Sequence, residues 1–283
     1  MSAKDQASSL RKLMKQTRSA RTIAIASGKG GVGKSNIALN LAILLSAGGS
    51  RVCLVDADLG LANLDVLLDL NVPYNLWHVT AGRKSLQEVV IDLDCGIQLV
   101  PGASGLARMT QLSEFERARL LDELGGLESE NDVIVVDCGA GIGADVLHFL
   151  ASADNVLVVT TPEPTAVTDG YAVIKVLTQQ GYEGSISLVV NFTSGRQEAR
   201  ATFNRVSSVA RQFLAARIFD GGYILTDPRV PEAVRMREPF VLAYPRCLAS
   251  RCLAALANKL RPGGSLLKSG GGFFRRLASW LAS

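Results

Sequence analysis

Cysteine pairs, histidine clusters and long apolar runs are all missing from this sequence of 283 residues. Its five cysteines form no Cys-x-x-Cys pair, and its two histidines, His78 and His148, stand far apart. The spacing argues against a disulfide framework, a zinc or iron–sulfur site and a histidine-based metal centre. There is no apolar run of about 18 residues or more, and the N-terminus is polar and charged, so neither a membrane span nor a signal peptide is expected. We therefore expect a cytoplasmic protein.

Aromatic residues are also scarce, at 6% against 48% hydrophobic residues, so much of the apolar content is aliphatic. That composition suits a parallel sheet covered by helices. Strand-like runs alternate with helical stretches, which implies right-handed crossovers. The runs cover residues 22–27, 51–55, 97–100, 133–137, 156–160 and 186–191, with a shorter one near 223–225. We predict an α/β fold with a doubly wound, mostly parallel sheet flanked by helices.

The net charge of +4 is unevenly distributed along the chain. Residues 1–21 carry +5 and residues 246–283 carry +7, which leaves −8 for the residues between them. A nucleic-acid-binding protein needs a basic surface on its body. We therefore expect no specific nucleic-acid binding.

A phosphate-binding loop follows the first predicted strand. It satisfies the pattern G-x-x-x-x-G-K-[ST] between an apolar strand and a helix, and comprises Gly28, Lys29, Gly30, Gly31, Val32, Gly33, Lys34 and Ser35, with Asn36 next in the chain. The glycines let backbone N–H groups face one anion, and the helix N-terminus adds its positive dipole. Lys34 is then expected on the β and γ phosphates and Ser35 on Mg²⁺. A purely structural glycine turn is the alternative.

The second lysine of this loop, Lys29, makes the motif resemble the deviant Walker A motif of the MinD/ParA ATPases. The resemblance implies a homodimer in the ATP state, in which Lys29 crosses to the partner's nucleotide and acts as an arginine finger does. It also implies that Asp58 orients the attacking water. Four apolar residues that end in Asp137 have the form of a Walker B strand, so Asp137 is expected to hold a Mg²⁺-bound water. Asp56 is expected to support the Mg²⁺ shell. The alternatives are a solvated loop lysine for Lys29 and a purely structural carboxylate for Asp56.

Two further positions are expected at the nucleotide. Asn191 ends a strand where the family reads the adenine edge, and no Asn-Lys-x-Asp guanine motif is present, so ATP is favoured over GTP. Glu163 stands where it can contact ribose across the dimer, with an exposed loop acid as the alternative.

The C-terminal residues form an amphipathic pattern after a Gly- and Ser-rich stretch. One helix face collects Phe273, Phe274, Leu277, Trp280 and Leu281, while Arg275 and Arg276 lie towards the other side. This pattern is typical of an interfacial membrane helix that binds an anionic membrane surface. The stretch 262–272 reads as a flexible linker, which disfavours the alternative of a helix docked on the core.

The N-terminal residues Asp5, Gln6, Leu10, Arg11 and Met14 lie in a segment with helical spacing. Its motif Asp-Gln-Ala-x-x-Leu-Arg resembles that of the FlhG family, also called YlxH or FleN, whose members are MinD-like regulators of flagellar number and placement. The resemblance implies that the segment binds the GTPase FlhF and stimulates its hydrolysis. Flagellar switch components or a transcription regulator are further partners that it suggests.

These patterns predict four parts of the chain. They are an N-terminal partner-activating segment, 1–21, an ATPase domain, 22–261, a linker, 262–272, and a membrane-targeting helix, 273–283. The predicted function is a slow, dimer-dependent Mg-ATPase that binds the inner face of the cytoplasmic membrane in its ATP state. A MinD-type cell-division ATPase, a ParA-type partitioning ATPase and a scaffold that retains nucleotide without useful turnover are the alternatives.

Overall fold

The computed structural model describes residues 20–58, 64–102, 114–261, 266 and 272–282. In this part of the chain the strands form one eight-stranded sheet in the order β3-β4-β2-β5-β1-β6-β7-β8. All neighbouring pairs are parallel except β3 with β4. The strands are β1 (Arg21–Ser27), β2 (Val52–Ala57), β3 (Ile91–Asp92), β4 (Gln98–Val100), β5 (Val133–Ala140), β6 (Asn155–Thr160), β7 (Ser185–Thr193) and β8 (Ile218–Leu225). The predicted doubly wound sheet is confirmed.

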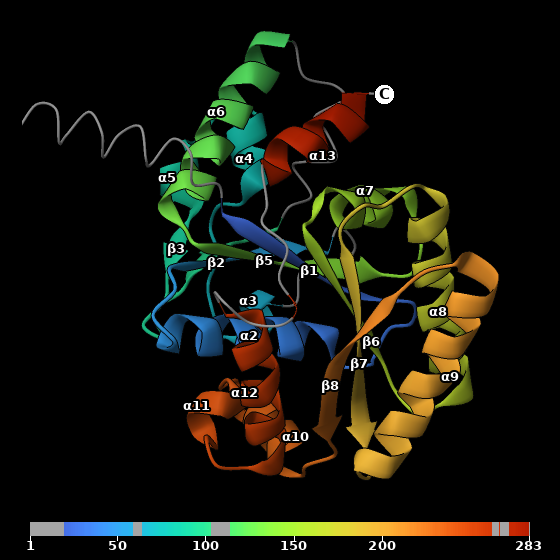
Figure 1. The fold of residues 1–283 in the computed structure, drawn as a ribbon. Coiled ribbons are helices and arrows are strands. Elements are labelled where there is room, and N and C mark those ends of the chain that lie inside the picture. The colour runs from blue at the N-terminus through green and yellow to red at the C-terminus, as the bar shows by residue number, and fades with distance from the viewer. Residues whose placement is uncertain (1–19, 59–63, 103–113, 262–265, 267–271, 283) are drawn as a thin grey trace, which may run out of the picture.

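Helices cover both faces of the sheet because the strands are apolar on both sides (Figure 1). In β1, Ala24 and Ala26 belong to one core cluster, and Ile23 and Ile25 belong to the other. The first layer holds α4 (Leu76–Thr80), α5 (Leu86–Val89), α6 (Glu114–Glu130), α7 (Ala144–Ser152), α8 (Pro164–Gln179) and α9 (Arg196–Leu214). The second holds α2 (Lys34–Ala47), α3 (Leu64–Leu67), α10 (Arg229–Met236), α11 (Phe240–Ala243) and α12 (Leu248–Leu260). Period-2 alternation thus divides the core between two layers.

The last helix, α13 (Phe273–Ala282), packs on the first layer beside α6 and α7 (Figure 1). Phe273, Phe274, Leu277 and Ala278 are buried in the same core cluster as residues of both helices. The sequence favoured a helix held away from the core, and the structure instead shows the docked arrangement. The physical reason is an apolar site on α6 and α7 that accepts the same face that the sequence assigned to lipid.

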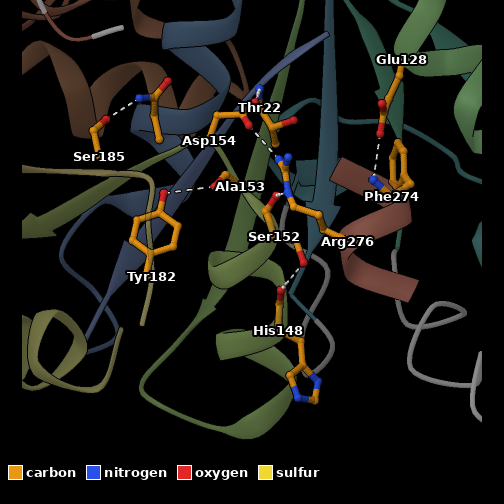
Figure 2. Close-up of polar contacts among 11 residues, drawn as sticks. Thr22, Glu128, His148, Ser152, Ala153, Asp154, Tyr182, Ser185, Phe274 and Arg276 are labelled. Carbon is orange, nitrogen blue, oxygen red and sulfur yellow. Dashed lines mark hydrogen bonds and ion pairs between the residues drawn. The ribbon is translucent and has the colours of Figure 1, made fainter. Parts of the chain in front are cut away.

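Polar contacts fix the docked helix as well (Figure 2). The backbone N–H of Phe274 donates to Glu128 Oε1 at 2.8 Å, and Arg276 Nε donates to the carbonyl of Ser152 at 2.8 Å. Arg276 also forms an ion pair with Asp154, whose other oxygen accepts the N–H of Thr22. Glu128 and Asp154 are both buried, so each satisfied carboxylate favours the docked position.

The stretch before α13 is only partly described. Leu266 is buried in the second core cluster, and its carbonyl accepts a hydrogen bond from Asn155 Nδ2 at 3.3 Å. Leu266 is therefore an anchor within the segment that the sequence predicted as a flexible linker. The division of the chain into four parts stays a prediction, and residues 1–19 lie outside the described residues. Among the described helices, none has the length and apolar character required to cross a membrane.

Candidate nucleotide site

The phosphate-binding loop joins the carboxyl end of β1, the strand at which the sheet order reverses direction, to the N-terminus of α2. Ligands of open α/β sheets bind at such a point. Gly33 has φ +88°, a left-handed conformation that favours glycine. A side chain at Gly28 would collide with the backbone of Asp169 in α8. The loop therefore needs glycine at both positions, which disfavours the interpretation of an ordinary surface turn.

The lysine that begins α2 is held by the Walker B carboxylate. Lys34 Nζ lies 2.6 Å from Asp137 Oδ1, and both side chains are buried. The Ser35 hydroxyl lies 3.5 Å from the same nitrogen. Lys34, Ser35 and Asp137 are thus brought together, as the sequence predicted. Burial raises the pKa of Asp137, and the Lys34 ammonium opposes that shift.

The second oxygen of Asp137, Oδ2, is buried and has no hydrogen-bond partner among the described residues. A free carboxylate oxygen beside a serine hydroxyl is a hard oxygen donor set of the kind that Mg²⁺ prefers. No group of three or more His, Cys, Asp or Glu side chains that could hold a metal occurs in the described ranges. The residues present therefore fit a Mg²⁺ ion that takes its other ligands from phosphate and water.

Asp56 is the penultimate residue of β2, opposite Asp137 of the neighbouring β5, and Asp58 follows the strand. Asp56 is buried and accepts the backbone N–H groups of Asp58 and Leu64, at 3.2 and 3.5 Å. Burial, with a smaller contribution from Asp137, raises the pKa of Asp56 to about 7. Asp56 therefore orders the backbone that carries Asp58. A Cβ added at Gly139 would lie 3.6 Å from Asp58 Oδ1, which places Asp58 against the carboxyl end of β5.

Lys29 lies apart from Lys34, near the surface. Its ammonium contacts Glu163 Oε1 at 2.8 Å and Thr165 Oγ1 at 3.1 Å, and the two charged side chains are 41% and 54% exposed. The hydrogen bond from Lys29 lowers the pKa of Glu163. An exposed pair of this kind stabilises the chain weakly. Lys29 is consequently accessible to a second molecule, whereas Lys34 is enclosed.

A cavity of about 650 Å³ lies beyond the phosphate loop, between β7, β8 and α10. Asn36 and Asn191 line it, and Asn191 Nδ2 donates to the carbonyl of Val32 at 2.8 Å. The rest of the cavity wall is mostly apolar, which suits the flat ring of a nucleotide base. The wall residues that the sequence analysis missed include Phe192, Ile224, Pro228, Val230 and Arg235. For Pro228 and Val230 the signal was the proline-containing turn after the carboxyl end of β8.

The predicted residues at the two ends of the chain are only partly placed. Phe273, Phe274 and Leu277 face the core, and Trp280 and Leu281 belong to α13 with side chains outside the described part. Membrane binding by these residues stays a prediction. The partner-binding residues Asp5, Gln6, Leu10, Arg11 and Met14 lie outside the described residues.

Comparison with known proteins agrees with this site. A family model described as an AAA domain matches residues 20–183. The antiactivator FleN of Pseudomonas aeruginosa is 40% identical over 240 residues, which cover 85% of this chain and 86% of FleN. The flagellum site-determining protein YlxH of Helicobacter pylori is 38% identical over 266 residues, 92% of this chain and 90% of YlxH. Both alignments extend over nearly the whole of each relative.

A solved structure has the same fold. The septum site-determining protein MinD of Pyrococcus horikoshii, complexed with Mg-ADP, superposes with a TM-score of 0.69 at 25% identity, covering 88% of this chain and 99% of MinD. With these relatives, the phosphate loop and the paired carboxylates form the candidate nucleotide site of this chain.

Proposed function

Since the chain belongs to the MinD/ParA family of P-loop ATPases, in the group that contains FleN and YlxH, we propose that it is an ATP-dependent dimerising switch that regulates the number or placement of flagella. One observation carries the proposal. The phosphate loop holds two lysines with different environments, one buried on Asp137 and one exposed on Glu163.

The buried lysine serves its own subunit. Lys34 would exchange Asp137 for the β and γ phosphates of ATP, because those oxygens offer it a higher negative charge. Ser35 and Asp137 would then hold Mg²⁺, with Asp56 ordering the strand end behind them. A Mg²⁺ ion bound there would neutralise charge on the phosphates.

The exposed lysine serves the other subunit. Lys29 would leave Glu163 and reach the partner's γ-phosphate, where it stabilises charge that develops as the bond to phosphorus breaks. Asp58, next to the carboxyl end of β5, would orient the attacking water. Glu163, freed from Lys29, would bind ribose across the dimer. Hydrolysis would then require two subunits and would be slow in a single one.

The C-terminal helix supplies the membrane output of this switch. The docked form hides Phe273, Phe274 and Leu277 from solvent, and a released α13 would present them to an anionic membrane. One short helix binds a membrane weakly, and two on one dimer bind more tightly through avidity. Residence at the inner face of the cytoplasmic membrane would therefore follow the ATP state.

The N-terminal segment supplies the partner output. The motif shared with the FlhG family leads us to expect that residues 1–21 bind the GTPase FlhF and stimulate it, with Gln6 and Arg11 at the partner's nucleotide and Leu10 and Met14 on its surface. Flagellar switch components or a transcription regulator are the further partners we expect. The names of the relatives, an antiactivator and a flagellum site-determining protein, support an output at flagella.

The deciding experiment measures GTP hydrolysis by the host's FlhF alone, with the intact protein, and with the chain lacking residues 1–21. We expect stimulation by the intact protein and none by the truncated one. Gln6→Ala should lose stimulation, and Ser9→Ala, at a variable position of the motif, serves as its matched control. Equal GTP hydrolysis in all mixtures would contradict the flagellar assignment and leave the ATPase assignment standing.

A further inference from the structure

A bulge interrupts β7 at the edge of the nucleotide cavity. Val190 lies opposite Tyr223 of β8, and Thr193 lies opposite Leu225, so β7 takes three steps along the chain where β8 takes two. The extra residue falls at Asn191-Phe192. Bulges occur next to active sites, where they redirect a side chain.

Phe192 occupies this bulge in a conformation that its side chain disfavours. Its φ is +53°, in the left-handed region that glycine and asparagine accept and that a bulky residue rarely adopts. It is also the one exposed residue of β7, at 44%, while the other eight are buried. A bulge needed only for the shape of the strand is built more easily with glycine. The strained, exposed ring therefore requires an explanation beyond the fold.

The ring lies at the border of the base cavity, close to the phosphate loop. Phe192 lines the cavity of about 650 Å³ together with Pro228 and Val230. On its other side it lines a second cavity of about 340 Å³, beside Lys29 and Glu163. Its tip approaches the loop, because a Cβ added at Gly33 would lie 3.3 Å from Phe192 Cζ. A nucleotide whose phosphates lie on the loop and whose base enters the larger cavity would lie beside this ring.

We propose that Phe192 is a base-stacking residue, which binds one face of the nucleotide's purine ring and positions the nucleotide between the loop and the cavity. The inference rests on the proposed nucleotide binding at the phosphate loop and adds a recognition residue to it. Stacking on an aromatic ring is attractive for any base, because every base has a π face. Phe192 therefore contributes affinity for the base, and the polar wall of the cavity selects among bases.

The experiment compares ADP with pyrophosphate, a probe that has the phosphates and lacks the base. Binding of each to the full chain and to Phe192→Gly is measured by isothermal titration calorimetry in Mg²⁺. We expect the Kd of ADP to rise about tenfold or more, with the Kd of pyrophosphate unchanged. The melting temperature of the nucleotide-free variant should rise, because glycine removes the backbone strain.

Two further variants separate the ring from the backbone. Phe192→Asn keeps a residue that tolerates the left-handed region and lacks the ring, so it should lose ADP affinity as glycine does. Phe192→Tyr keeps the ring and should bind ADP within about twofold of the original chain.

Three results would overturn the proposal. They are an unchanged Kd for ADP in Phe192→Gly, an equal loss of ADP and pyrophosphate, which would mean that the ring shapes the phosphate loop, and a fall in the melting temperature of the nucleotide-free variant. Failure of the unmodified chain to bind either probe would instead contradict the nucleotide function itself.

Discussion

At the scale of single residues, Asp56 couples the nucleotide site to pH. Its pKa is raised to about 7 because it is buried and lies near Asp137. The folded chain thus binds the proton of the Asp56 carboxyl group more tightly than the unfolded chain does. The contribution of the protonated Asp56 to the free energy of unfolding is therefore fully present below about pH 4 and is lost as the pH rises through about 7.

As the pH rises from 5 to 8, the unmodified chain should lose about 2 to 3 kcal/mol of unfolding free energy relative to Asp56→Asn, which has no carboxylate to ionise. Urea unfolding of nucleotide-free protein in a chelator measures the difference. Asp94→Asn removes an exposed carboxylate and should show no such trend. Stability curves that stay parallel across this pH range for Asp56→Asn would refute the assignment.

The ion pair between Lys34 and Asp137 gives a second residue-scale prediction. Lys34→Ala leaves a buried carboxylate without its cation, and such a loss costs about 3 to 5 kcal/mol. The double variant Lys34→Ala/Asp137→Asn should recover most of that stability, because the uncompensated charge is gone. Chemical unfolding of both variants without nucleotide provides the measurement. Equal instability of the single and double variants would mean that the lysine stabilises the chain by packing.

At the scale of elements, α13 depends on a charged contact as well as on its apolar face. Arg276 pairs with the buried Asp154, whereas its neighbour Arg275 is exposed. Arg276→Ala should lower the free energy of unfolding by about 1 to 2 kcal/mol and increase binding to anionic vesicles in ADP. Arg275→Ala has the same loss of charge and should leave stability unchanged. Vesicle sedimentation and urea unfolding test the pair, and identical behaviour of the two variants would contradict a docking role for Arg276.

The same helix shows where sequence reasoning ends. The phosphate loop and the Walker B strand were predictable because each motif carries its function within a few consecutive residues. The docking of α13 depends on surfaces of α6 and α7, which lie more than a hundred residues earlier in the chain. The periodicity of 273–281 defines an apolar face and does not specify whether lipid or protein covers it. β3, with two residues, is too short to leave a pattern.

Phe192 marks a second limit of sequence reasoning. The apolar run before Asn191 indicated a strand, whereas the bulge at Phe192 is a shift in the register between β7 and β8. A register shift depends on the neighbouring strand, so the residues of β7 alone do not predict it.

At the scale of the whole molecule, the proposed hydrolysis requires Lys29 to act in a second subunit. Lys29→Ala and Asp58→Ala should each abolish hydrolysis, because every site of either homodimer lacks one of the two groups. In a mixed dimer, the site that keeps Asp58 receives the intact Lys29 of its partner. That site should hydrolyse ATP.

The most direct test is therefore ATP hydrolysis by an equal mixture of Lys29→Ala and Asp58→Ala. Random pairing makes half of the dimers mixed, each with one working site of two, so the account predicts about a quarter of the unmodified activity. Each variant alone is the control and should be inactive. A mixture that remains as inactive as its separate components would contradict the claim that hydrolysis requires the partner's Lys29.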